Sequence, residues 1–288
     1  MSIVIENLTH TYMEKSSNAC TALSNINLTV KDGEFLGIIG HTGSGKSTLI
    51  QHFNGLMQPT GGSVTVDGYD MSDKKQRVKG RALVGMVFQY PDYQLFDSTV
   101  LDDIAFGPKN LGMKPDEAKK RAAEAMELVG LEPEDAGKSP FELSGGKKRR
   151  AALAGIIAMR PKYLVLDEPM AGLDPSGRED VRNTIKKLRS ELSCAVVMVS
   201  HSMEDIAKSA ERIVILNKGK LYAVGTPDEI YADADRLIGL GLDAPEMTKL
   251  ITLLREKNID VPKGIFTNEQ FIRWFRQAKA AKAVKGNA

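Results

Sequence analysis

The sequence of 288 residues contains little cysteine and almost no net charge, and each shortage excludes a class of protein. The two cysteines, Cys20 and Cys194, are isolated and lack metal-site spacing, so we interpret both as buried small apolar residues in a reducing compartment. Lys and Arg number 39 against 37 Asp and Glu, which gives a net charge of +2. Because no strong positive field results, no nucleic-acid partner is expected.

Long apolar runs are also missing. No stretch approaches the roughly 18 uncharged apolar residues that cross a bilayer, and residues 1–6 carry neither a basic leader nor an apolar core. We therefore expect a chain that is neither secreted nor embedded in a membrane, although it can dock on a protein that is. With 42% hydrophobic residues it can bury a full core, as one large domain or as one domain with an appendage.

A glycine-rich segment predicts a nucleoside triphosphate site. Gly40-His-Thr-Gly-Ser-Gly-Lys-Ser47 has the complete phosphate-loop spacing, between a strand-like run and a helix-like run. Its glycines let backbone N–H groups surround phosphates, Lys46 can reach the β and γ oxygens, and the Ser47 hydroxyl can hold Mg²⁺. A plain glycine turn before a helix is the weaker alternative. The residues predicted to bind nucleotide here are Gly40, His41, Thr42, Gly43, Ser44, Gly45, Lys46, Ser47 and Thr48.

The apolar pattern predicts an α/β fold with a parallel sheet and helices on both faces. Residues 3–37 alternate in hydropathy, with turns expected at Asn25 and at Asp32-Gly33. Two short apolar runs flank a helical segment at 176–192, which is a βαβ unit. The predicted strands after residue 37 are 62–68, 81–88, 163–166, 195–199, 213–216 and 221–224, of which the last two form a hairpin.

Helical patterns occupy two further regions. One runs from Val100 to Arg160 and includes a helix over 116–129 that stops at Gly130. The other follows a shift in composition at residues 225–227, with helices expected at 247–256 and 268–280. We therefore predict a nucleotide-binding domain at 1–225 with a helical subdomain at about 90–160, and a C-terminal helical extension at 226–288.

Polar residues follow directly on several predicted strands. Asp167 can hold Mg²⁺ at the carboxyl edge of the sheet, and Glu168 can orient and deprotonate an attacking water. His201 follows the next strand, where we favour contact with the γ-phosphate over a purely structural role. Gln89 also ends a strand, and its amide can bind the attacking water or Mg²⁺. An ordinary Asp-Glu-Pro turn remains the alternative for the carboxylates.

A second glycine segment, Leu143-Ser-Gly-Gly-Lys147, has no simple explanation. Ser144 can cap a helix that continues to Met159, and the end of that helix can attract an anion. Taken alone, the segment is more often just a cap. The charge run 147–150 is usually a solvated helix face.

Together these motifs resemble an ATP-binding-cassette (ABC) ATPase over roughly residues 1–225. They follow the order of that family: phosphate loop, Gln89, the signature 143–146, Asp167-Glu168, the D-loop 171–174 and His201. The resemblance implies a phosphate-loop ABC fold, in which a parallel sheet core carries an N-terminal antiparallel β subdomain and a helical subdomain. It also implies ATP and Mg²⁺ as ligands and Tyr12 as the adenine-stacking aromatic, although Tyr12 as an ordinary strand aromatic stays open.

Two cassettes of this family pair head to tail, and the signature of one closes over the ATP held by the other. Ser144, Gly145, Gly146 and Asp174 would then serve the partner's nucleotide. A single chain should therefore hydrolyse ATP poorly.

A narrower resemblance points to the energy-coupling factor (ECF) vitamin importers, and among them to the second ATPase subunit. It rests on residues 40–52, 88–96, 106–110 and 201–205. It implies three partners: a related second ATPase that forms a heterodimer, an integral membrane coupling protein, and a separate membrane protein that captures the substrate. It also implies a peripheral position at the cytoplasmic face of the cell membrane, and a dimerisation role for the C-terminal extension at 226–288. The aromatic segment Tyr90, Tyr93, Leu95 and Phe96 would grip a helix of the coupling protein, or else pack the helical subdomain.

Three other functions stay open: an ATPase of another importer, such as one for metal ions, a soluble ABC ATPase outside transport, and a non-hydrolysing ATP-binding module. Two residues also depart from the family pattern, Lys147 in place of the signature Gln and Met170 where Thr is common. A cation in the first helical turn opposes the helix dipole by a few tenths to about 1 kcal/mol, but it favours a polyanionic nucleotide. The activity of the composite site closed by this signature is therefore left open.

Overall fold

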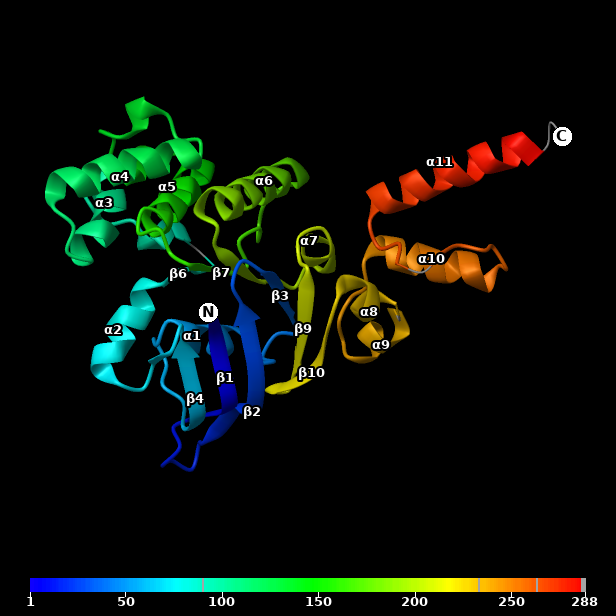
Figure 1. The fold of residues 1–288 in the computed structure, drawn as a ribbon, viewed down its shortest axis with the longest axis horizontal. Coiled ribbons are helices and arrows are strands. Elements are labelled where there is room, and N and C mark those ends of the chain that lie inside the picture. Colours follow the sequence, from blue (N-terminus) through cyan, green and yellow to red (C-terminus); the bar gives the residue numbers. More distant parts are fainter. Residues whose placement is uncertain (90, 233, 263, 286–288) are drawn as a thin grey trace.

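The structure is a computed structural model that describes residues 1–89, 91–232, 234–262 and 264–285. In these residues the strands form an antiparallel sheet of order β2-β1-β4-β5 and a larger sheet of order β10-β9-β3-β8-β7-β6 (Figure 1). The strands are β1 (Ser2–Tyr12), β2 (Cys20–Lys31), β3 (Phe35–Ile39), β4 (Gly61–Val66), β5 (Tyr69–Asp70), β6 (Val84–Val87), β7 (Tyr163–Asp167), β8 (Ala195–Val199), β9 (Arg212–Asn217) and β10 (Lys220–Gly225).

The larger sheet is parallel from β9 through β6, and only β10 runs antiparallel, as a hairpin with β9. Its central strands are continuous apolar runs because both faces are covered. One face packs against the smaller sheet and the buried side of α1 (Lys46–Phe53). The other face packs against α6 (Pro175–Leu192) and α7 (Met203–Ala207). The predicted α/β fold and the βαβ unit are confirmed.

The helices of the middle region gather at one end of the molecule (Figure 1). Thr99 caps α3 (Val100–Asn110) by accepting a hydrogen bond from the backbone N–H of Asp102. Ser144 caps α5 in the same way, as the sequence predicted. The helices are α2 (Lys74–Ala82), α3, α4 (Pro115–Leu128) and α5 (Gly145–Ile157), with short 3₁₀ turns at Pro91–Gln94, Pro133–Asp135 and Pro140–Glu142.

Three local predictions were wrong. Asn25 does not form a turn: it lies inside β2 with φ 52°, where a bulge in the pairing with β1 absorbs it. The strand expected from residue 81 begins only at Val84, because the Asp73 carboxylate caps α2 and the helix runs through Ala82. Cys20 is exposed at the start of β2, whereas Cys194 is buried as expected.

The residues after β10 form α8 (Pro227–Tyr231), α9 (Ala234–Gly239), α10 (Glu246–Glu256) and α11 (Asn268–Lys285). Tyr231 joins this part to the larger core, and its hydroxyl donates to the Met203 carbonyl at 3.1 Å. The last two helices share a small apolar cluster of their own around Met247 and Ile251, and Figure 1 shows α11 above α10. Helices at 247–256 and 268–280 are thereby confirmed. No helix in the described part of the chain combines the length and hydropathy that a bilayer span requires.

A buried carboxylate organises the loop before the signature helix. The Asp135 side chain is fully buried, and its two oxygens each lie 2.7 Å from an ammonium group, on Lys138 and Lys147. These two hydrogen bonds lower the pKa of Asp135 to about 2, against the opposing effect of burial. Since the folded pKa lies below the unfolded value of about 3.9, the charged carboxylate stabilises the fold at neutral pH. That contribution is lost as the pH falls from about 4 towards 2.

We therefore expect Asp135→Asn to lower the free energy of unfolding at pH 7 by about 1–3 kcal/mol, because two cations lose their carboxylate. Urea unfolding at several pH values measures this, and the deficit should shrink between about pH 4 and pH 2. Glu134→Gln removes the same charge from an exposed position in the same turn and should leave stability unchanged. A deficit that persists undiminished in acid would contradict this explanation.

Candidate active site

The predicted phosphate loop joins β3 to α1, and its backbone requires glycine at two positions. A Cβ atom on Gly40 would lie 2.4 Å from the Leu216 carbonyl oxygen, and one on Gly45 would lie 2.7 Å from the Ala22 carbonyl oxygen. Gly45 also has φ 101°, a conformation that residues with a side chain rarely adopt, at the N-terminus of α1. The loop therefore fits tightly between β2 and the β9–β10 hairpin.

Hydrogen bonds from the hairpin turn hold the loop in place. The backbone N–H of Gly219 donates to the Ser44 carbonyl at 3.0 Å, and His41 Nε2 lies 3.1 Å from Asn217 Oδ1. The Lys46 ammonium curls over the loop and donates to the carbonyls of Gly40 and His41 at 2.7 and 3.1 Å. The loop thus leads directly into the N-terminus of α1, where the positive dipole end and the first backbone N–H groups of a helix can bind phosphate.

Charged groups of opposite sign face each other below this loop. Asp167 ends β7 and is largely buried; burial raises its pKa, and a hydrogen bond with the Ser47 side chain opposes that rise. Burial lowers the pKa of Lys46, while the negative charges of Glu168 and Asp167 act in the other direction. Burial disfavours the charged form of both Lys46 and Asp167, and each charge partly offsets this effect on the other. A bound anion would further favour charged Lys46, and a bound cation would further favour charged Asp167.

Glu168 and His201 form a direct pair. Glu168 follows β7 with φ 51°, and its Oε2 lies 2.9 Å from Nδ1 of His201, which follows β8. The Glu168 backbone N–H donates to the Val199 carbonyl at 2.9 Å, so the two strand ends are fixed relative to each other. The carboxylate is mostly buried and the imidazole is 70% exposed. Glu168 is thus oriented by a partner that itself reaches solvent.

A cleft of about 1080 Å³ brings most of the predicted site together. Tyr12 lines it and is held at the rim by a 3.0 Å hydrogen bond between its hydroxyl and Thr48 Oγ1. Ser44 does not line the cleft, because its side chain is fully buried behind the loop. The predicted residues that line the cleft are Tyr12, Gly40, His41, Thr42, Gly43, Gly45, Lys46, Ser47, Thr48, Gln89, Asp167, Glu168 and His201.

The cleft also contains residues that the sequence did not predict. Lys218 comes from the turn of the β9–β10 hairpin, and Gly241, Leu242 and Asp243 come from the loop between α9 and α10. A lysine beside a turn glycine is a weak signal for an anion site. The loop 241–243 carries no phosphate-binding pattern, and only the folding of the C-terminal part brings it here.

The signature residues lie elsewhere. Ser144, Gly145 and Gly146 are exposed at the N-terminus of α5, and none of them lines the cleft of the phosphate loop. Asp174 is also outside the cleft and caps α6 by accepting from the Gly177 N–H at 2.9 Å. The Lys147 ammonium lies 2.7 Å from Asp135, a carboxylate that it shares with Lys138.

A phosphate loop, a strand-end carboxylate pair with its histidine, and a separate glycine signature on this fold define an ATP-binding cassette ATPase. The chain belongs to the ABC transporter family, which matches residues 23–171. The predicted family and the ATPase class are confirmed.

Two curated relatives carry the same description, "Energy-coupling factor transporter ATP-binding protein EcfA2". The one from Caldanaerobacter subterraneus subsp. tengcongensis is 50% identical over 284 residues, which cover 97% of this chain and 99% of the relative. The one from Clostridium perfringens is 52% identical over 272 residues, which cover 94% of this chain and 95% of the relative. The narrower resemblance to ECF ATPases is confirmed.

Solved structures show the same fold. That of cbiO1 from Clostridium perfringens, described as part of the ABC transporter complex cbiONQ, has a TM-score of 0.73 and 34% identity, and the match covers 87% of this chain and 98% of that one. The cassette MJ0796, solved as a dimer bound to ADP and Pi, has a TM-score of 0.70 and 32% identity, with 78% of this chain and 98% of that one covered.

Proposed function

We propose that this chain is one of two ATPase cassettes that power an ECF-type importer, and that it hydrolyses ATP only when paired. One observation carries the proposal: the signature at Ser144 is exposed and does not line the chain's own cleft. Its N–H groups can reach a nucleotide only if that nucleotide is held by another cassette. The dimeric structures of the MJ0796 cassette support this mode of pairing.

Within its own cleft, each residue takes a role that its position supports. The phosphate loop and Lys46 bind the β- and γ-phosphates, and Tyr12 stacks on the adenine. Glu168 accepts a proton from the attacking water, and His201 holds Glu168 and contacts the γ-phosphate. Ser144, Gly145, Gly146 and Asp174 complete the partner's site.

Ser47, Asp167 and Gln89 supply the protein oxygens for Mg²⁺. A hydroxyl, a carboxylate and an amide suit this hard cation, and Ser47 and Asp167 are already hydrogen-bonded. No cluster of three or more His, Cys, Asp or Glu side chains that could hold a metal occurs in the described residues. That fits an ion that takes few protein ligands and relies on phosphate oxygens. When bound, Mg²⁺ neutralises charge that develops on the phosphates.

A groove lined by Phe88 and by residues 94–96, which flank Gln89 in the sequence, suits the membrane coupling protein. About 540 Å³ in volume, it lies between α2, α3 and α5, with Leu56, Val78, Phe96 and Phe106 partly exposed along it. Phe96 packs edge-on against Phe106 at 4.8 Å, and Leu95 forms part of the buried floor. Tyr93 is 84% exposed, whereas Tyr90 lies outside the described residues. An amphipathic helix fits such a surface.

Docked there, the chain is a peripheral subunit at the cytoplasmic face of the cell membrane, in an assembly with the coupling protein and a substrate-capturing membrane protein. The partner cassette is a related but different chain, and the C-terminal helices contribute to the pairing. Exposed apolar side chains on α10 and α11, such as Leu253, Ile272 and Phe275, support that contribution.

We expect Glu168→Gln to lower turnover at this chain's own site by about 10²–10⁴-fold, because general-base catalysis is worth that much. The amide keeps the shape of the side chain, so ATP binding should survive and the paired state should accumulate. Phosphate release and gel filtration with ATP, measured on the complete assembly in which the partner's catalytic carboxylate is disabled, test this. An undiminished rate would remove Glu168 from its role.

Replacing Tyr93 and Phe96 together by Ala should release the cassettes from the membrane proteins while ATP binding persists, because the groove loses Phe96 and the segment next to the groove loses the exposed Tyr93. Co-purification from detergent-solubilised membranes gives the measurement. Phe141→Ala is the matched control, since Phe141 is 70% exposed but lies outside the groove. Assembly that survives the double replacement would refute docking at this groove.

A further inference from the structure

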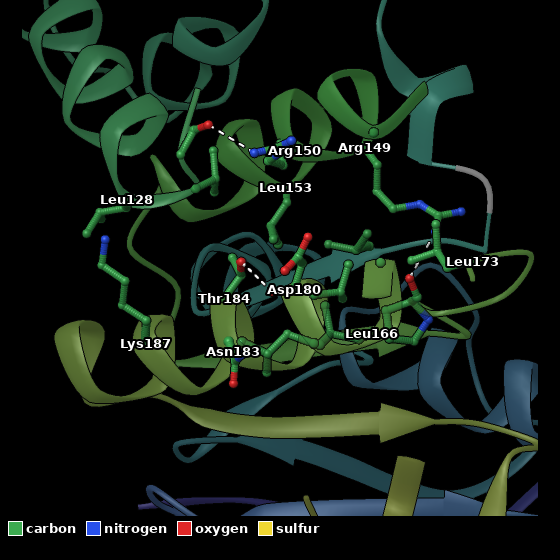
Figure 2. Close-up of a pocket in the computed structure, with 18 residues that line it drawn as sticks. Leu128, Arg149, Arg150, Leu153, Leu166, Leu173, Asp180, Asn183, Thr184 and Lys187 are labelled. Carbon is green, nitrogen blue, oxygen red and sulfur yellow. Dashed lines mark hydrogen bonds between the residues drawn. The ribbon is translucent and has the colours of Figure 1, made fainter. Parts of the chain in front are cut away.

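Arg149 links the signature helix to the segment that follows the catalytic carboxylate. Its guanidinium donates to the Pro169 carbonyl at 3.4 Å and to the Ala171 carbonyl at 3.2 Å. Figure 2 shows the side chain reaching from α5 down towards the stretch that carries Leu173. Arg149 is thus a bridge between two parts of the chain that serve different nucleotides.

The bridge ends close to Glu168. Pro169 is the next residue, and the Ala171 backbone N–H donates to the Glu168 carbonyl at 3.1 Å, which closes a tight turn. Ala171 is therefore bonded on one side to Glu168 and on the other to Arg149. A displacement of the Arg149 guanidinium acts on the turn that holds Glu168 at its positive φ.

The far end of the same segment is fixed to the core. Arg178 Nε donates to the Leu173 carbonyl at 3.2 Å, and the buried Asp205 carboxylate pairs with both Arg178 and Arg182. Asp205 lies on α7, four residues after His201. The segment 169–173 is thus held by the signature helix at one end and by the histidine-bearing part of the core at the other.

α5 packs against the core through buried residues such as Ala154 and Ile157, but part of the space between α5 and α6 is not filled. A cavity of about 520 Å³ separates α5 from α6, and Leu153, Leu166, Leu173 and Asp180 line it (Figure 2). Where side chains interdigitate, displacements pass by direct contact. Across this gap, the Arg149 guanidinium connects α5 to the segment 169–173, because its planar donors bond two carbonyls at once.

We propose that Arg149 is a positioning residue: it transmits the seating of the signature on the partner's ATP to Glu168 of its own chain. Ser144 and Arg149 lie on one rigid helix, so a nucleotide that pulls on the helix N-terminus moves the guanidinium with it. The inference rests on the proposed pairing of cassettes. Arg149 would physically connect the two composite sites within this chain. Any effect of ATP at one site on ATP affinity at the other is then reciprocal.

Arg150 provides a matched control at the next position of the same helix. Its guanidinium also donates to a backbone carbonyl, that of Gly130 at 3.1 Å, but this bond stays within the helical region (Figure 2). Neither arginine has a carboxylate partner among the residues that the structure describes. The two side chains therefore differ mainly in which part of the chain they hold.

The test uses the complete assembly with the partner's catalytic carboxylate replaced by Gln, so that only Glu168 of this chain turns over ATP. Arg149→Gln should lower kcat by about 10- to 100-fold, since small misplacement of catalytic groups costs that much. It should leave KM unchanged and reduce the cooperativity of the ATP dependence. Arg150→Gln should leave all three unchanged. Arg149→Lys keeps the charge but loses the planar pair of donors. Its kcat should therefore lie between that of the unsubstituted chain and that of Arg149→Gln.

Unchanged kcat and cooperativity in Arg149→Gln would overturn the inference, and so would an equal loss in Arg150→Gln, which indicates general damage to the helix. If Arg149→Gln fails to fold, the Arg149→Lys variant decides by the same criteria. Failure of the proposed function would instead appear as an unsubstituted assembly that does not hydrolyse ATP, before any variant is compared.

Discussion

The parallel register of β3, β8 and β7 is the constraint on which the site depends. Ile38 and Asp167 both pair with Val199, so the three strands end at the same level of one sheet edge. The phosphate loop, Asp167-Glu168 and His201 are the residues that come next along each strand. The sheet therefore brings the predicted phosphate loop, the Asp167-Glu168 pair and His201, which lie far apart in the sequence, around one cleft.

The glycines around this edge follow from the same constraint. The loop after β3 must pass between Ala22 of β2 and Leu216 of β9, and no side chain fits at Gly40 or Gly45. The β9–β10 turn then reaches back to bond Ser44 through Gly219. The phosphate loop is thus rigid because of the strands beside it as well as its own composition.

The signature residues lie on a separate part of the chain from the cleft. The helical region presents Ser144 away from the cleft, and the Lys147 ammonium lies 2.7 Å from Asp135. Because Lys138 shares the same carboxylate, Asp135 offsets only part of the positive charge near this helix end. The N-terminus of α5 is exposed, and Arg149 on the same helix bonds the segment that follows Glu168.

Local patterns predicted β7, β8 and the Ser144 cap because periodicity and capping are properties of neighbouring residues. They also predicted most of the residues that line the cleft, because several of these follow directly on an apolar run. They failed where a distant segment decides the outcome. The bulge at Asn25 depends on pairing with β1, the Asp135–Lys147 pair joins residues twelve apart, and the loop 241–243 reaches the cleft only through the packing of Tyr231 and Leu242. Arg149 looked like part of a solvated charge run because its carbonyl partners lie beyond the next strand.

The central claim is that each nucleotide is enclosed by two chains. The most direct measurement is the ATP hydrolysis rate of this chain as a strict monomer, verified by light scattering, followed by titration with the partner cassette. The account predicts that the monomer binds ATP but barely hydrolyses it, and that turnover rises in proportion to the pairs formed. A monomer that hydrolyses ATP at the rate of the pair would contradict it.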